Sequence, residues 1–299
     1  MVSQKARSLR AAGEIAGKAR DYGASLVKEG VKLLDVAEKV EDFILKSGAD
    51  LAFPVNLSIN HQAAHYTPTH DDTRTFKKGD VVKVDVGAHI DGYIGDTAVT
   101  VEVGTEHQSR LIEASSEALE AAISLIKPGM LTGEVGQTVS TVISSLGFRP
   151  VRNLTGHQLE QYVLHAGISI PNVNDGSRSV LREGMAIAVE PFASAGSGLV
   201  DGRTSGNIFH AVRIRYIDDT VIDALVKAVE ERRGLPFSER YLYKNDPDPE
   251  NFSLHLRKLH RIGVIRPYPI LSDTKGGLIS QKEHSLLITA DGCEVLTQT

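Results

Sequence analysis

The spacing of apolar residues predicts helices at the start of the chain and a β-hairpin after them. Residues 6–47 carry an apolar stripe at intervals of three and four, which predicts helix, and Gly48 is placed to end it. The period changes over residues 80–103, which are rich in Val and Ile and centred on Asp91-Gly92, a dipeptide typical of hairpin turns. The same reasoning predicts further helices and then short strands, at 107–126, 132–146, 185–192 and 284–289.

Part of this pattern occurs twice. Residues 28–48 align without gaps with residues 127–147, and Lys, Gly, Val, Val, Ile and a final Gly recur at the same places. A second echo links Asn56-Leu57-Ser58 with Asn153-Leu154-Thr155, each followed shortly by a His-Gln pair. We interpret the echo as two related α+β halves that face each other with a site between them.

Composition narrows the class of protein. With 299 residues, 41% of them hydrophobic and 24% charged, the chain is typical of globular proteins, with room for two domains or one large domain with an insert. The formal charge of −5 gives no electrostatic indication of a nucleic-acid partner. Cys293 is the one cysteine, which excludes an internal disulfide and fits a reducing compartment. Because the sequence has neither a signal-peptide core nor an apolar run of membrane-spanning length, we expect a cytoplasmic protein without a membrane partner.

The hairpin carries the first candidate chemistry. A two-residue turn at its centre pairs Ile90 with Tyr93 and sets Asp85 opposite Ala98, so that Asp96 is a diagonal neighbour of Asp85 on the same face. Two carboxylates this close in an apolar strand pair resist ionisation unless a cation lies between them. The alternative is that both face solvent, or that one caps a turn.

Three further residues could complete a metal site. His157 follows a glycine, where a bend could project it; Glu190 ends a strand on its inward face; and Glu283 opens another strand. Alone, each is more typical of a solvated strand end or a hydrogen-bonded polar group. With the two Asp residues they supply one imidazole and four carboxylates, a ligand mix that suits divalent Mn, Fe, Co or Zn and not a thiolate zinc cage.

The motifs around these residues resemble those of the methionine aminopeptidases, and of their type 2 in particular. The motifs are KVDVG, GDTA, TGHQ, AVEP and QKEHS, together with HQAAHYTP and LHAG. The AAHYTP segment and an inserted block indicate type 2, and without a long charged N-terminal extension the chain resembles the archaeal form. The resemblance implies an α+β pita-bread fold with pseudo-twofold halves, in agreement with the echo.

The resemblance also implies roles for the metal ligands. Asp85 would hold one ion, His157 and Glu190 the other, and Asp96 and Glu283 would bridge the two. A water between the metals would be the nucleophile, and Glu190 would accept its proton. The expected cofactors are thus two divalent ions, either Co, Mn, Fe or Zn.

Other site residues follow from the same resemblance. His65 and His165 would contact the scissile amide and the developing oxyanion, and Phe53 would line the pocket for the methionine side chain. The alternatives are core histidines fixed in one tautomer and a phenylalanine of the apolar core. His284 faces away from Glu283, and we assign the other histidines near the motifs to structure or to the rim, namely His61, His70 and His89.

The inserted block, residues 206–270, is predicted to be helical. One helix is expected between an Asp cap and Gly234, and another ends at Gly263 before the extended VIRPYP. This arrangement resembles a winged helix, but acidic residues just upstream of its basic ones lead us to favour a structural wall of the cleft over a nucleic-acid surface. We therefore expect a pita-bread catalytic domain from 1–205 and 271–299, and an inserted helical subdomain from 206–270.

The sequence as a whole predicts a metallo-aminopeptidase. It would remove the initiator methionine from nascent polypeptides with a small second residue, as a monomer, with contact to the ribosome left open. One alternative is a proline-directed dipeptidase or aminopeptidase P, against which AAHYTP and the insert argue. Another is a non-catalytic RNA- or partner-binding relative, against which the intact ligand set argues.

Overall fold

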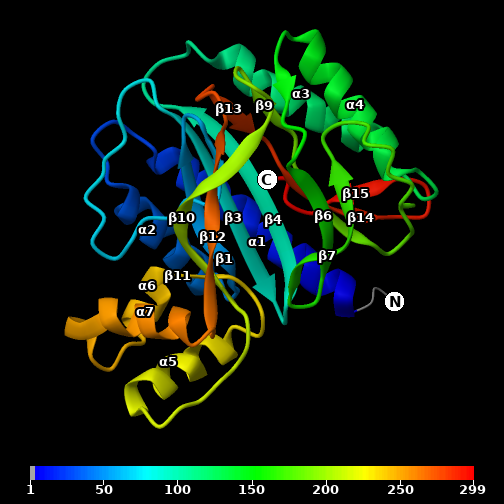
Figure 1. The fold of residues 1–299 in the computed structure, drawn as a ribbon. Helices are drawn as coiled ribbons and strands as arrows, with labels where there is room; N and C mark the ends of the chain where they lie inside the picture. The colour runs from blue at the N-terminus through cyan, green and yellow to red at the C-terminus, as the bar shows by residue number, and fades with distance from the viewer. Residues whose placement is uncertain (1–3) are drawn as a thin grey trace.

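The computed structural model describes residues 4–299 and is drawn in Figure 1. The first apolar stripe forms two helices, α1 (Gln4–Leu26) and α2 (Leu33–Lys46), so the prediction of one helix over 6–47 is wrong in its middle. Gly30 takes a φ of +79°, and its N–H donates to the Phe76 carbonyl at 2.9 Å. A turn therefore separates the helices although the apolar spacing continues through it. Gly48 follows α2 with a φ of +85°, as predicted.

The predicted hairpin is confirmed. Strand β3 (Val81–Ile90) pairs with β4 (Tyr93–Glu102), and Asp85 lies opposite Ala98. Both turn residues have positive φ, 53° at Asp91 and 81° at Gly92, as a type I′ turn requires. Strand β1 (Asp50–Ile59) completes an antiparallel sheet in the order β1-β3-β4, on which α1 and α2 pack. In Figure 1, α1 crosses behind this sheet.

The second half repeats the plan of two helices on a sheet. Helices α3 (Ser109–Leu125) and α4 (Thr132–Ser145) share a core with a sheet of order β7-β6-β8-β14-β15. The strands of this sheet are β6 (Thr155–Glu160), β7 (Val163–Pro171), β8 (Ala186–Val189), β14 (His284–Ile288) and β15 (Cys293–Val295). A small sheet beside it contains β5 (Arg149–Pro150), β9 (Phe192–Ser194) and β13 (Ile279–Gln281).

Equivalent hydrogen bonds in the two halves explain the sequence echo. The Leu33 N–H donates to the Arg74 carbonyl at 3.0 Å where α2 begins, and the Thr132 N–H donates to the Ser179 carbonyl at 2.9 Å where α4 begins. The two residues occupy equivalent places in the aligned segments 28–48 and 127–147. The sequence echo therefore reflects a structural repeat. In each half, an isolated β-bridge directly precedes the helix, α2 in the first and α4 in the second.

The two halves join along β4 and the entry to β14. The Glu283 N–H donates to the Ala98 carbonyl at 3.0 Å, and Thr97 Oγ1 donates to the Glu283 carbonyl at 2.8 Å. Asp96 and Glu283 therefore come from opposite halves but lie on the same seam.

Residues 206–270 lie to one side of the seam and contain a separate apolar core. Strand β10 (Val200–Ala211) leads into them and β12 (Ile265–Asp273) leads back, and β12 also pairs with β2 (Gln62–Ala64). Between them lie α5 (Thr220–Glu231), β11 (Phe237–Ser238), α6 (Glu239–Lys244), a 3-10 turn (Pro249–Asn251) and α7 (Phe252–Arg261). Figure 1 places these helices away from α3 and α4. Asp219 caps α5 as predicted, and the short helix α6 lies between the two helices that were expected. No helix among the described residues is long and apolar enough to cross a membrane.

Candidate metal centre and active-site cavity

A cavity of about 250 Å³ opens at the seam between the halves. Side chains from both halves line it, and β10, β12 and the segment before β11 add Ile208, Tyr268 and Pro236. Every site residue expected from the sequence is in this lining: Phe53, His65, Asp85, Asp96, His157, His165, Glu190 and Glu283. Residues far apart in the chain are therefore gathered in one place.

Three potential metal ligands form a compact cluster in the cavity, namely Asp96, His157 and Glu283. One ligand atom from each lies within 4.8 Å of the others, and His157 Nε2 lies 3.6 Å from Asp96 Oδ2. All three residues are buried. Asp85 and Glu190 line the same cavity but are outside this three-atom cluster.

The local backbone explains how the cluster is presented. Asp85 and Asp96 are diagonal neighbours on the cavity face of the hairpin, as the turn predicts. His157 lies within strand β6, and in place of a turn the pairing of β6 with β7 shifts register between His157 and Gln158. The glycine before it serves a close approach instead, because a Cβ on Gly156 would lie 2.3 Å from the Ala188 carbonyl oxygen on β8.

The four carboxyl groups are poorly suited to carry charge without a cation. Burial raises the pKa of Asp85 to about 7. Burial, together with repulsion from the neighbouring carboxylates, raises the pKa of Asp96, Glu190 and Glu283 well above its ordinary range. A bound dication would remove this penalty, because it favours the charged carboxylates.

The donor set fits divalent metal ions. Asp85 Oδ1 and His157 Nδ1 are buried without a hydrogen-bond partner among the described residues. Burial and then the neighbouring His165 lower the pKa of His157 to about 3, so its ring is neutral, the form that binds metal. Carboxylate oxygens with one imidazole suit borderline and hard divalent ions.

Sequence reasoning missed Gln281, which holds two of the carboxylates. Its Nε2 donates to Glu190 Oε2 at 3.2 Å and to Glu283 Oε2 at 3.3 Å. Its backbone is fixed in turn by Thr100, whose hydroxyl donates to the Gln281 carbonyl at 2.7 Å and accepts from its N–H at 2.8 Å. A signal existed, since Gln281 precedes Glu283 by two residues and so shares its face.

His65 and His165 lie beside the acidic cluster. The His165 ring lies edge-on to the His157 ring, with the two ring centroids 4.4 Å apart. His65 Nδ1 lies 3.2 Å from the Pro269 carbonyl oxygen. Burial, followed by the neighbouring His165, lowers the pKa of His65 to about 4, and burial lowers the pKa of His165. Both rings are therefore neutral near pH 7 and can donate or accept hydrogen bonds.

Apolar side chains line part of the cavity, and Phe53 lies across the sheet from Asp96. The backbone places Phe53 opposite Gly87 and Gly87 opposite Asp96. A Cβ on Gly87 would lie 2.2 Å from the Phe53 ring, so the glycine of KVDVG lets this ring lie flat on the sheet. Leu164 and Phe192 are further apolar residues of the lining.

The remaining histidines near the motifs stay outside the lining of the cavity. His284 Nδ1 lies 2.8 Å from Thr297 Oγ1, His89 Nδ1 accepts the Gly92 N–H at 3.1 Å, and His70 binds Glu239. His61 is exposed.

Comparison with known proteins agrees with this geometry. The sequence model that describes Metallopeptidase family M24 matches residues 7–224 of the chain. The chain therefore belongs to this family. It is 44% identical over 288 residues to the methionine aminopeptidase of Archaeoglobus fulgidus, covering 96% of each chain.

Solved structures confirm the fold. The methionine aminopeptidase of Thermotoga maritima superposes with a TM-score of 0.71 at 25% identity, covering 100% of this chain and 98% of that one. A thermophilic Arx1 superposes with a TM-score of 0.85 at 18% identity, covering 100% of this chain and 92% of that one. These matches confirm the expected α+β pita-bread fold.

Proposed function

We propose that this protein is a methionine aminopeptidase, which hydrolyses the first peptide bond of nascent polypeptides that begin with methionine and a small second residue. The observation that carries the proposal is that all the expected ligand, histidine and pocket side chains line one cavity. The near-full-length similarity to a methionine aminopeptidase supports the same activity.

We assign two divalent ions to the buried carboxylates. Asp85 would hold one ion, His157 and Glu190 the other, and Asp96 and Glu283 would contact both. When bound, such ions lower the pKa of a coordinated water and polarise the scissile carbonyl. Co, Mn, Fe and Zn all suit these donors, and availability selects among them.

The side chains around the metal centre would then handle protons and charge. Glu190 would take the proton of the attacking water. The Gln281 amide, which donates to the Glu190 carboxylate, would hold that carboxylate in place. His65 and His165, as neutral imidazoles, would contact the scissile amide and the carbonyl oxygen that gains negative charge. Phe53 and Leu164 would contact the methionine side chain.

We further assign the protein to type 2, with residues 206–270 as an inserted subdomain that walls the cleft. The AAHYTP segment and the insert support the type, and the separate apolar core from Phe209 to Ile265 supports the subdomain. The contribution of Ile208, Pro236 and Tyr268 to the cavity supports its role as a wall. The free thiol of Cys293 is consistent with a cytoplasmic location.

Methionine release from Met-Ala-Ser and Met-Leu-Ser tests the proposal. We expect release from the alanine peptide and little from the leucine peptide, because the larger second side chain crowds the metal centre. Cleavage of an Xaa-Pro dipeptide in place of Met-Ala-Ser would favour a proline-directed peptidase. Folded protein that cleaves none of these with any metal would favour a binding protein of the same fold.

A further inference from the structure

The chain around His65 is held in an unfavourable backbone conformation. His65 has a φ of +67°, in the left-handed region that residues other than glycine rarely adopt. Its N–H donates to Asn56 Oδ1 at 2.9 Å, and β2, which ends just before it, pairs through Ala64 with Leu271 on β12. Such a conformation persists only where the surroundings impose it, so the direction of the His65 ring depends on how both flanks are held.

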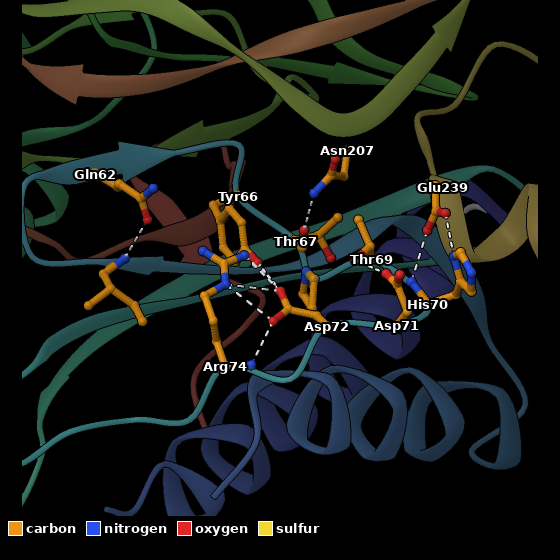
Figure 2. Close-up of polar contacts among 12 residues, drawn as sticks. Gln62, Tyr66, Thr67, Thr69, His70, Asp71, Asp72, Arg74, Asn207 and Glu239 are labelled. Atoms are coloured by element: carbon orange, nitrogen blue, oxygen red, sulfur yellow. Dashed lines mark hydrogen bonds and ion pairs between the residues drawn. The ribbon is translucent and has the colours of Figure 1, made fainter. Parts of the chain in front are cut away.

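The flank after His65 is a polar loop, residues 66–74, which is bound on one side by the catalytic body. The Leu57 N–H donates to the Tyr66 carbonyl at 2.8 Å, and Thr67 Oγ1 donates to the Val55 carbonyl at 2.8 Å. Farther along, Asp72 accepts hydrogen bonds from the Tyr66 hydroxyl and from Arg74 (Figure 2).

On its other side the loop is bound by residues 206–270. Asn207 Nδ2 donates to the Thr67 carbonyl at 3.1 Å, and the Arg240 guanidinium donates to Thr67 Oγ1 at 2.9 Å. Figure 2 shows Glu239 reaching His70 from this side, where the carboxylate accepts the His70 N–H at 2.9 Å and lies 2.5 Å from His70 Nδ1. The His70 ring also stacks on Tyr243, with centroids 3.8 Å apart and planes 14° apart.

We propose that residues 206–270 position His65, and that Glu239 is a positioning residue that acts through His70 and the 66–74 loop. The inference rests on the proposed function, in which His65 contacts the scissile amide. Glu239 is buried and is not part of the cavity lining, so its side chain does not touch the substrate, and its carboxylate binds His70 of the loop. Without its carboxylate the loop loses two of the hydrogen bonds that hold the C-terminal flank of His65 in place.

Glu239→Ala is the first test. We expect kcat for Met-Ala-Ser to fall about tenfold, in the range typical of groups that orient catalytic residues, while KM and bound metal stay unchanged. Glu239→Gln should recover most of the loss, because its amide can still pair with both the His70 N–H and the ring nitrogen. Should Glu239→Ala prove unstable, His70→Ala removes the ring contact from the other partner and should lower kcat in the same direction.

Asp246→Ala is the matched control. Asp246 is also a buried carboxylate in the insert and also binds a histidine, with Oδ2 2.8 Å from His255 Nδ1, but it does not touch the loop. We expect its kcat to stay within about twofold of the wild type. An equal loss in Asp246→Ala would overturn the inference, because it would mean that general loosening of the insert lowers activity.

A double-mutant cycle separates the inference from the proposed function. If Glu239 acts through His65, Glu239→Ala should change kcat by less than about twofold in a His65→Ala background. Equal tenfold losses in both backgrounds would overturn the role of Glu239 while leaving that of His65 intact. If His65→Ala alone left kcat unchanged, the proposed role of His65 would fall and the inference with it.

Discussion

Asp96 and Ser285 exchange two hydrogen bonds across the seam between the halves. The Asp96 N–H donates to Ser285 Oγ at 2.8 Å, and Ser285 Oγ donates back to the Asp96 carbonyl at 2.8 Å. One buried hydroxyl thus fixes the backbone of a proposed bridging ligand from one half to the strand that follows Glu283 in the other. This contact therefore helps to set the relative position of the two carboxylates that we propose as bridging ligands.

Ser285→Ala should weaken both the fold and the metal centre. Two buried backbone groups lose their partner, which costs on the order of 1–3 kcal/mol of unfolding free energy, and the shifted ligands should bind metal about 10–100-fold more weakly. Chemical denaturation and metal titration measure the two effects.

Ser280→Ala is the matched control for this change, because its buried hydroxyl donates to the Leu111 carbonyl at 2.6 Å, within the second half and not across the seam. It should lose stability without losing metal affinity. Equal weakening of metal binding in the two variants would contradict the account.

Gln281→Leu should lower activity through the carboxylates that the amide holds. Leucine has a similar size but cannot donate to Glu190 and Glu283. We expect about a tenfold to hundredfold loss of metal affinity, with a matching loss of methionine release at limiting metal. Unchanged metal affinity would show that the amide does not orient these ligands.

Removal of metal should make stability depend on pH in a defined direction. The pKa of Asp85 is raised to about 7 from an ordinary 3.8, so in chelated protein the folded state binds more protons than the unfolded state between these values. The contribution of Asp85 to the free energy of unfolding is present below about pH 4 and is lost as the pH rises through about 7. It amounts to roughly 4 kcal/mol.

The lowered pKa values of His65 and His157 act in the opposite direction, so the test compares chelated wild type with chelated Asp85→Asn. The wild type should lose stability relative to the variant from pH 4 to 7, as measured by denaturant titration at each pH. Parallel profiles for the two proteins would contradict the burial of an uncompensated carboxyl group at Asp85.

Gly87→Ala should displace the Phe53 ring. The new Cβ would lie 2.2 Å from the ring, so the ring must move into the cavity or the sheet must shift, at a cost of about 1–3 kcal/mol of stability. We expect a raised KM for Met-Ala-Ser. Adding Phe53→Leu should relieve part of both effects, whereas additive losses in the double variant would mean that the two side chains do not meet.

Local signals in the sequence account for the parts of the site that were predicted. Asp91-Gly92 fixes a two-residue turn, and that turn fixes the register that sets Asp85 beside Asp96. The break at Gly30 was missed because the apolar stripe continues through it and the opposing bond comes from Phe76, far along the chain. Ser285 and Glu239 gave no local signal, since their partners belong to the other half and to a distant loop. Gln281 was not predicted because a neutral amide, unlike the carboxylates and the imidazole near it, is not a typical ligand for these metals.

We propose above all that the buried acidic cluster is a metal centre and that this centre releases methionine. Bound metal and methionine release from Met-Ala-Ser should be measured together, on chelator-stripped wild type, Asp96→Ala and His65→Ala after metal is added back. The expected result is that stripped wild type is inactive until metal is added, that Asp96→Ala neither retains metal nor releases methionine, and that His65→Ala retains metal but turns over slowly. Methionine release by stripped wild type, or metal retained by Asp96→Ala and lost by His65→Ala, would contradict it.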